Sequence, residues 1–263
     1  MANNTQQKHD PIRDHYFKSL RAVDDLSGWL FYIAAALSFT ALLVDKEHSH
    51  RVYDLVQVLF VLAVIAVFVI GLVIRLYLTP RAEDMRRKDL ISKTYGVLLT
   101  HKETIGYYNN DQTTTKFLGF SVMENSFFSK EILLEMAKFE RLKVGAYALF
   151  FIIVVLNRNT DLAVASTAAV AVFSEQVFSR WLRLEWLCSR CETTYSNLYN
   201  LFQSSPTSPM LQAKVLEAVI FYETSKSNGG ITLSEKIFLK LNQKLSEEWE
   251  SIKLALENKQ KGE

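Results

Sequence analysis

Two cysteines are the first residues whose type and spacing suggest chemistry. Cys188 and Cys191 form a single C-x-x-C pair. A zinc site needs four ligands, usually two such pairs or one pair with histidines. The five histidines of the chain lie far from this pair and show no ligand spacing. Both cysteines fall in a helical pattern, about one turn apart. We therefore interpret them as ordinary helix residues in a reducing cytoplasm.

A cluster of tyrosines and amides is the second candidate. The sequence GYYNND could bind a ligand through ring stacking and amide hydrogen bonds, with the weak site residues Tyr107, Tyr108, Asn109, Asn110 and Asp111. The alternative is a loop in which Asn and Asp satisfy turn geometry, and we favour it. Both interpretations stay open.

A polar triplet before two phenylalanines could form the edge of a site. It consists of Glu124, Asn125 and Ser126, followed by Phe127 and Phe128. A helix cap followed by buried aromatic residues is the simpler interpretation, and we favour that one.

Familiar catalytic motifs are missing from the chain. We find no P-loop, no dinucleotide-binding glycine fingerprint after a strand, no H-E-x-x-H and no G-x-S-x-G. The net charge is only +2, and no stretch combines Lys and Arg with interleaved aromatic residues. We therefore predict a protein that is no enzyme, takes no cofactor or metal, and binds no nucleic acid.

The elements that position these residues follow from the apolar blocks. The chain has 263 residues, 49% of them hydrophobic, but only four prolines and nine glycines, which favours long helices. Gly28–Val44 and Leu55–Ile74 are almost free of polar residues. The second segment is long enough to cross a bilayer with some tilt. It is too long for a buried β-strand, because strands rarely exceed about 10 residues. Both segments read as membrane helices.

A weaker pair of apolar segments follows. Leu142–Leu156 and Leu162–Phe178 are separated by only Asn157–Asp161, which predicts an antiparallel hairpin. A buried hairpin in a cytosolic domain is the alternative. We favour the membrane because the first two helices already place the chain there. The predicted class is all-α, an integral membrane protein with four transmembrane helices and a helical cytoplasmic domain.

Orientation follows from the basic residues that flank the segments. The Lys and Arg residues of loops 45–54 and 157–161 are only Lys46, Arg51 and Arg158. The segments on the other side of the membrane carry many more basic residues. Both termini are therefore expected in the cytoplasm, and the polar N-terminus argues against a signal peptide. We expect five divisions: an N-terminal helix (1–27), two membrane helices (28–79), a central region (80–141), a membrane hairpin (142–178) and a C-terminal region (179–263).

Polar residues within the apolar segments need a separate explanation, because such groups are costly at membrane depth. Gln57 and Glu175 lie near segment ends, where snorkelling to the interface is the favoured account. Ser166 and Thr167 lie in a run of small residues that allows close helix approach. This run predicts an oligomer interface or a pore lining.

The cytoplasmic pieces are expected to pack together as helices. Residues 96–120 suit an ordered loop, and a helix should then run into the third segment. After the fourth segment, apolar residues from Val177 to Phe202 step by three and four, which predicts packing against another helix. Ser208 is expected to cap the next helix, Met210–Ser225.

The arrangement resembles the four-helix membrane effectors of bacterial antiphage systems, the S-4TM type associated with nucleotide-second-messenger synthases. The residues that carry the likeness are RRKDLISKTYGVLL, GYYNND, ENSFF and ITLSEKIFLKLNQKLSEEW. The resemblance implies a multi-pass protein of the bacterial inner membrane. It would sense a cyclic nucleotide or a cytosolic protein, form a homo-oligomer and disrupt the lipid bilayer. A membrane-anchored sensor or scaffold that recruits a cytosolic partner is the alternative.

Overall fold

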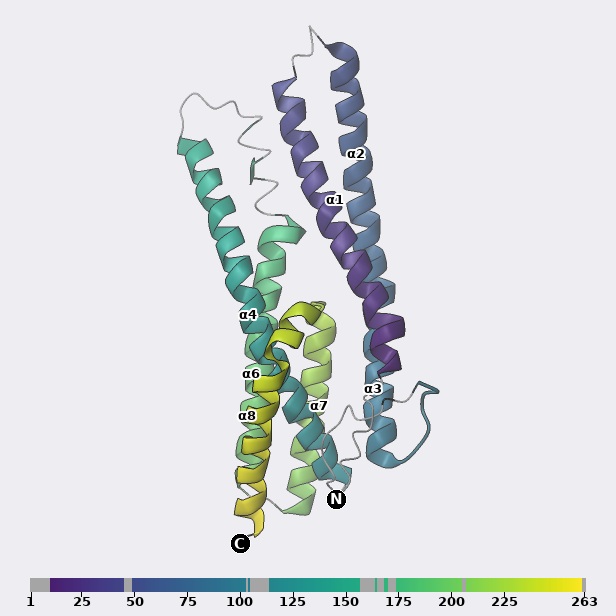
Figure 1. The fold of residues 1–263 in the computed structure, drawn as a ribbon, viewed down its shortest axis with the longest axis vertical. Helices are drawn as coiled ribbons and strands as arrows, with labels where there is room; N and C mark the ends of the chain where they lie inside the picture. Colours follow the sequence, from purple (N-terminus) through teal and green to yellow (C-terminus); the bar gives the residue numbers. More distant parts are fainter. Residues whose placement is uncertain are drawn as a thin grey trace. The chain divides into compact units, whose positions relative to one another are not determined.

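Helices are the only regular secondary structure in the described part of the protein. A computed structural model describes residues 10–44, 49–102, 104, 114–156, 164, 168–169, 174–204 and 207–261, and no strand occurs among them (Figure 1). The predicted all-α class is confirmed. The helices form two compact units. Unit 1 comprises the described residues of 1–17, 81–136 and 184–263, and unit 2 those of 18–80 and 137–183.

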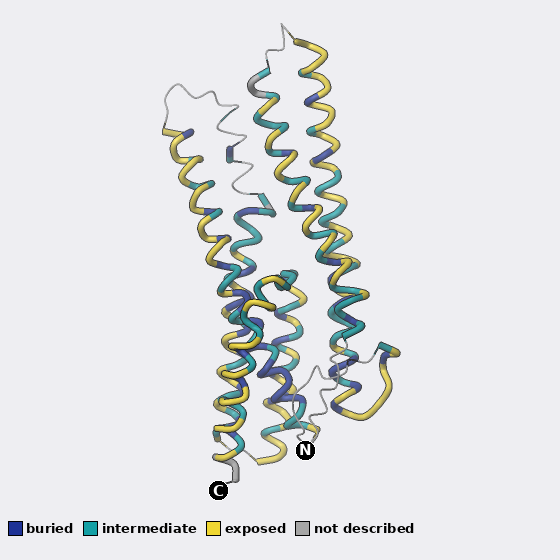
Figure 2. Tube along the Cα trace, viewed as in Figure 1, coloured by how far each residue is buried: buried dark blue, intermediate teal, exposed yellow. Residues whose placement is uncertain are grey.

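Unit 2 contains the two most apolar helices of the chain. The helices α1 (Lys18–Leu43) and α2 (His50–Val73) pack along each other. A π-helical turn, Ile74–Leu78, joins α2 to α3 (Thr79–Tyr95) without a break. Most of α2 is exposed, as its largely yellow trace in Figure 2 shows. An apolar helix that protein does not bury is typical of a lipid-facing element.

Within the described residues, two helices are long and apolar enough to cross a membrane. They are Arg13–Ala41, with 29 residues, and His50–Tyr95, with 46. In their most apolar stretches only 11% and 6% of the residues are buried. A core helix of a globular domain would be mostly buried instead. The second predicted segment lies within His50–Tyr95, and the first, Gly28–Val44, extends three residues beyond Arg13–Ala41.

The third predicted segment is the C-terminal part of α4 (Thr114–Leu156), so the helix expected to run into it is confirmed. Charged residues precede Val144, which leaves the 13 residues Val144–Leu156 free of charge. They rise about 20 Å, less than the ~30 Å of a hydrocarbon core. Most of the fourth segment, Leu162–Phe178, lies outside the described residues.

Unit 1 is built around an aromatic cluster. It joins α4 to α6 (Arg180–Gln203) and α8 (Glu235–Lys261). Phe120 stacks on Phe202 with ring centroids 4.4 Å apart, and Trp249 lies 6.5 Å from Phe120 and 6.3 Å from Phe127. The predicted apolar face of α6 is confirmed, because Leu184, Leu198 and Phe202 are all buried.

The start of α4 differs from the prediction. The helix begins at Thr114, whereas the sequence suggested a loop as far as residue 120. Glu124–Ser126 therefore lie inside the helix and do not cap it. β-Branched residues such as Thr114 and Thr115 weaken the local helix signal. Burial of Leu118 and Phe120 in the core outweighs that weakness.

The helix α7 (Ser208–Gly229) also begins earlier than predicted. If Ser208 were the N-cap, the first helical residue would be the one after it, but Ser208 is itself helical. Thr207 precedes the helix with φ −58° and ψ 151°, and Ser208 is its first residue. Pro209 fixes the register, because a proline without N–H fits only the first turn. At the other end Gly230 adopts the left-handed conformation, with φ 55°, that commonly ends a helix.

Candidate functional site

The structure separates the site residues suggested by the sequence. Tyr107–Asp111 lie outside the described residues, as do Ser166 and Thr167. Glu175 opens the π-helical turn Glu175–Ser179, and its side chain is outside the described part. Gln57 is exposed on α2, and its Nε2 donates to the Tyr53 hydroxyl at 2.8 Å. This bond, one helical turn back, satisfies part of the amide.

Both cysteines lie in α6, as predicted, and are buried as free thiols. Burial, and then the neighbouring Cys188, raise the pKa of Cys191 to about 12. A protonated, buried thiol is a poor nucleophile and a poor metal ligand. Among the described residues, no group of three His, Cys, Asp or Glu could hold a metal ion.

A largely buried charge cluster of unit 1 surrounds Lys226 on α7. Its Nζ lies 2.8 Å from Glu83 Oε2 on α3 and 3.0 Å from Glu223 Oε1 on its own helix. The side chains of Lys226 and Glu83 are only 17% and 20% exposed. The cluster therefore ties α3 to α7 with a partly desolvated ion pair.

Lys226 remains a cation in this setting. Burial alone lowers its pKa, but the carboxylates of Glu83 and Glu223 outweigh that effect and raise the pKa well above its ordinary value. A lysine that stays protonated cannot act as a general base or as an amine nucleophile. The cluster therefore holds helices together and offers no basic group for catalysis.

A buried tyrosine completes this region. The Tyr222 hydroxyl lies 3.1 Å from Ser129 Oγ on α4, and Lys226 Nζ lies 4.9 Å from its ring centre. Burial raises the pKa of Tyr222, and the positive charge of Lys226 only partly opposes this. The phenol is neutral at physiological pH, so this region too is structural.

A second charge cluster lies in unit 2 where the apolar part of α4 begins. Arg180 Nη1 lies 3.3 Å from Asp24 Oδ2, and its Nε lies 3.6 Å from Glu140 Oε1. Lys143 Nζ contacts the other Glu140 oxygen at 2.5 Å. Two acids and two bases thus balance one another. Charges paired in this way can lie beside an apolar layer at reduced cost.

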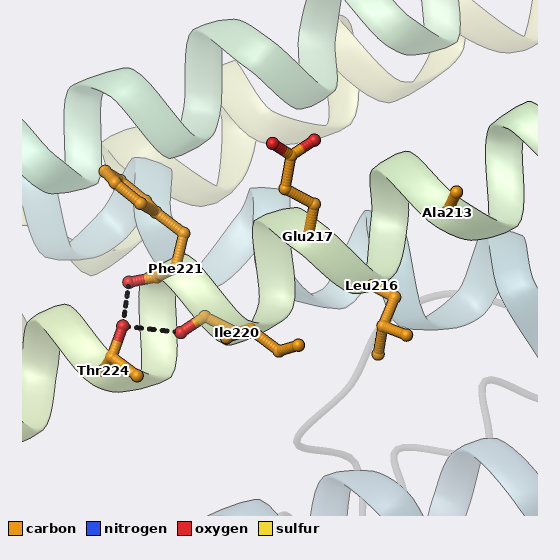
Figure 3. Close-up of a pocket in the computed structure, with 6 residues that line it drawn as sticks. All are labelled: Ala213, Leu216, Glu217, Ile220, Phe221 and Thr224. Atoms are coloured by element: carbon orange, nitrogen blue, oxygen red, sulfur yellow. Dashed lines mark hydrogen bonds between the residues drawn. The ribbon is translucent and has the colours of Figure 1, made fainter.

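A shallow surface hollow lies on α7 (Figure 3). Its walls are mostly apolar, and all of its lining residues belong to this one helix: Ala213, Leu216, Glu217, Ile220, Phe221 and Thr224. Thr224 turns its hydroxyl back to the Ile220 and Phe221 carbonyls, at 2.7 and 3.1 Å. The hollow therefore offers apolar contact rather than polar recognition.

Sequence reasoning missed both Lys226 and the α7 hollow. A signal for Lys226 was present, since it follows Val215, Ala218, Tyr222 and Ser225 on the same buried stripe. A lysine at such a position needs a carboxylate partner. Its partner Glu83 is 143 residues away along the chain, so no local pattern identifies it.

The chain matches no protein-family model, no characterised protein and no solved structure. The helices and surfaces described above are therefore the basis for inferring function.

Proposed function

We propose that this protein is a non-enzymatic effector of the bacterial inner membrane that permeabilises the bilayer as a homo-oligomer when its cytoplasmic part senses a trigger. The observation that carries the proposal is the exposure of the most apolar helices. The apolar stretches of α1 and α2 are almost entirely unburied by protein. Lipid is the solvent that makes such surfaces stable.

The second support is the contrast between the two units. Unit 1 has a packed aromatic core and buried ion pairs, as a folded sensor domain requires. Unit 2 exposes apolar residues along α1, α2 and the end of α4. The resemblance to the antiphage effectors adds the direction of the coupling, from a cytoplasmic trigger to membrane damage, with both termini in the cytoplasm.

The four-helix topology is part of this proposal. The apolar end of α4 is short, and a short helix enters a bilayer by thinning it locally or by oligomerising. Such thinning suits a protein that damages membranes. The exposed apolar side chains within Val144–Leu156 would be unfavourable in water, whereas lipid stabilises them.

Labelling of the predicted outer loop tests this topology. Arg158→Cys should react with a membrane-impermeant maleimide in intact spheroplasts, whereas Ser227→Cys on α7 should react only after lysis. If Arg158→Cys also needs lysis, the hairpin does not cross, and only the first two helices remain as spans.

Membrane potential tests the function itself. We expect overproduction, or phage infection of cells that carry the protein, to depolarise the inner membrane within one growth cycle, as read by a potential-sensitive dye. The insertion-defective variant Phe68→Arg serves as the control and should leave the potential intact. Normal potential and growth in both arms, with the wild-type protein present in the membrane, would refute an effector role.

A further inference from the structure

Four charged residues tie three helices of unit 2 together. They are Asp24 on α1, Glu140 and Lys143 on α4, and Arg180 at the start of α6. We call these four residues the ion network. Their side chains are between 11% and 22% exposed, and the two acids balance the two bases. Loss of one partner from such a pair leaves a poorly solvated charge without its counter-ion. The network is therefore stable only while all four members are in place.

A further polar contact joins the same part of unit 2. The side-chain Nε2 of Gln176 donates to Ser27 Oγ on α1 at 3.2 Å, and Ser27 is only 1% exposed. The backbone carbonyl of Gln176 accepts a bond from Lys143 Nζ at 3.5 Å. Gln176 therefore links α1 to a member of the ion network.

Polar contacts have particular weight between helices that lie in lipid. The helices α1 and α4 also meet through an apolar pair, Phe39 and Phe150, whose ring centroids are 6.0 Å apart. Lipid tails offer these rings an equally apolar environment, so apolar contact gives little drive for helix association in a bilayer. Interhelical hydrogen bonds and ion pairs have no such substitute in lipid tails. We therefore expect the ion network to fix α1 against α4.

A π-helical turn lies directly before Arg180. It spans Glu175–Ser179, and the Ser179 N–H donates to the Ser174 carbonyl, five residues back, at 3.4 Å. π-Helical turns are rare and frequently occur at functional sites. Because this turn holds one residue more than an α-helical turn, its conversion to α-helix rotates the following helix by about 100°. Such a rotation carries Arg180 away from Asp24.

The helix α6 continues from unit 2 into unit 1. The division falls between Arg183 and Leu184, about one turn after Arg180. Beyond the division, α6 contributes the buried residues Leu198 and Phe202 to the core of unit 1. A rotation of α6 within unit 1 therefore reaches Arg180 along one continuous helix.

We propose that the ion network is a latch, which holds α1 against α4 in the resting protein and opens when α6 rotates from its unit 1 end. Opening separates α1 from the apolar end of α4 and frees both for contacts with other copies. This inference rests on the proposed function, for which it supplies the step between the sensor and the membrane helices.

Charge reversal tests the latch in cells that have met no phage. Asp24→Arg sets two arginines against each other, and at low expression it should raise the fraction of depolarised cells about tenfold. Asp24→Arg with Arg180→Glu keeps two acids and two bases, and it should return that fraction to the wild-type level. Glu217→Arg on α7 is the matched control, because it reverses one acid of an exposed pair on a single helix. It should leave the potential unchanged.

Immunoblots of the membrane fraction separate an opened latch from simple damage to the fold. Asp24→Arg should reach the membrane in the wild-type amount. Two results would overturn the proposal: an Asp24→Arg variant that is silent while infected wild-type cells depolarise, and a double variant that is as active as the single one.

A cross-link beside the network reports the latch without any membrane damage. Ser27→Cys with Gln176→Cys should be joined by a short, membrane-permeant bismaleimide in isolated membranes, giving a band of altered mobility that neither single substitution gives. Addition of Asp24→Arg should lower the yield about tenfold, and further addition of Arg180→Glu should restore it. An unchanged yield with Asp24→Arg would refute the latch.

The two proposals fail in different ways. If Asp24→Arg lowers the cross-link yield and infected wild-type cells depolarise, but the variant alone does not, the latch fails and the effector role stands. If Asp24→Arg lowers the yield but neither the variant nor infected wild-type cells depolarise, the opening of the network stands and the effector role fails.

Discussion

At the scale of single residues, two glycines of the same helix meet opposite surroundings. A Cβ on Gly119 would lie 2.6 Å from Phe202 Cζ and 3.0 Å from Val215 Cγ2. A Cβ on Gly145 would have no neighbour within 4 Å. Phe202 is buried and stacked on Phe120, so it cannot move aside. Gly119 is thus required for close packing of α4, α6 and α7.

We expect Gly119→Ala to lower the free energy of unfolding by about 1–3 kcal/mol, because overpacking forces the core apart. Gly145→Ala should leave stability unchanged or raise it by ~0.5–1 kcal/mol through helix propensity. Thermal unfolding in detergent, followed by circular dichroism, measures both. A Gly119→Ala variant as stable as Gly145→Ala would contradict the packing.

Cys191 provides a second residue-scale prediction. With a pKa near 12, its thiol should resist iodoacetamide at about pH 8.5, where an ordinary thiol is half ionised. Unfolding in denaturant should restore full labelling. Leu239→Cys supplies an exposed thiol for comparison. Rapid labelling of native Cys191 would show that its thiol is accessible and would contradict the burial.

At the scale of elements, helix pairing in unit 1 depends on a few desolvated contacts. Two Lys–Glu pairs with the same i, i+3 spacing occur on α7. The Lys226 pair is buried and also reaches Glu83 on α3, whereas the Lys214–Glu217 pair is largely exposed. The same i, i+3 spacing should therefore contribute more to stability in the buried Lys226 pair than in the exposed Lys214 pair.

Lys226→Met should cost about 3–5 kcal/mol, since it leaves two carboxylates without their buried cation. Lys214→Met should cost only ~0–1 kcal/mol, because water screens the exposed pair. Urea unfolding of the two variants measures the difference. Equal midpoints would mean that the α3–α7 link contributes little.

The stabilisation by Lys226 depends on pH in a predictable direction. The folded pKa of Lys226 lies above its unfolded value, so its stabilisation is complete below about pH 10.4 and is lost as the pH rises through the folded pKa. We therefore expect the stability gap between wild type and Lys226→Met to stay constant from about pH 7 to about pH 9. A gap that closes within that range would contradict the assignment.

At the scale of the whole molecule, the question is which solvent surrounds each apolar surface. Phe68 on α2 and Leu239 on α8 are almost equally exposed, at 65% and 64%. If water surrounded both, arginine would be tolerated equally at the two positions. The proposed function places lipid around Phe68 and water around Leu239.

We therefore expect Phe68→Arg to lose roughly 2.5–3.5 kcal/mol of insertion free energy, and Leu239→Arg to lose almost none. Alkaline extraction of membranes, with immunoblots of pellet and supernatant, compares the two variants. Equal retention in the pellet would count against lipid as the environment of α2.

Several features follow from the sequence because their causes are local. Leu55–Ile74 forms a helix independently of the other elements. Its side chains are apolar, and the hydrogen bonds of a helix satisfy its backbone groups within the segment itself. The α6 stripe is similar, because a period of three and four residues places Leu184, Leu198 and Phe202 on one face.

Other features were decided only by tertiary structure, because they join distant residues. Val215 and Leu216 are neighbours in sequence, yet one is buried in the core and the other lines the surface hollow. The start of α4 at Thr114 depends on burial of Phe120 against Phe202 and Trp249, and Lys226 meets Glu83 only through the packing of α3 on α7. A local pattern predicts that a face is apolar, but the fold alone decides what covers it.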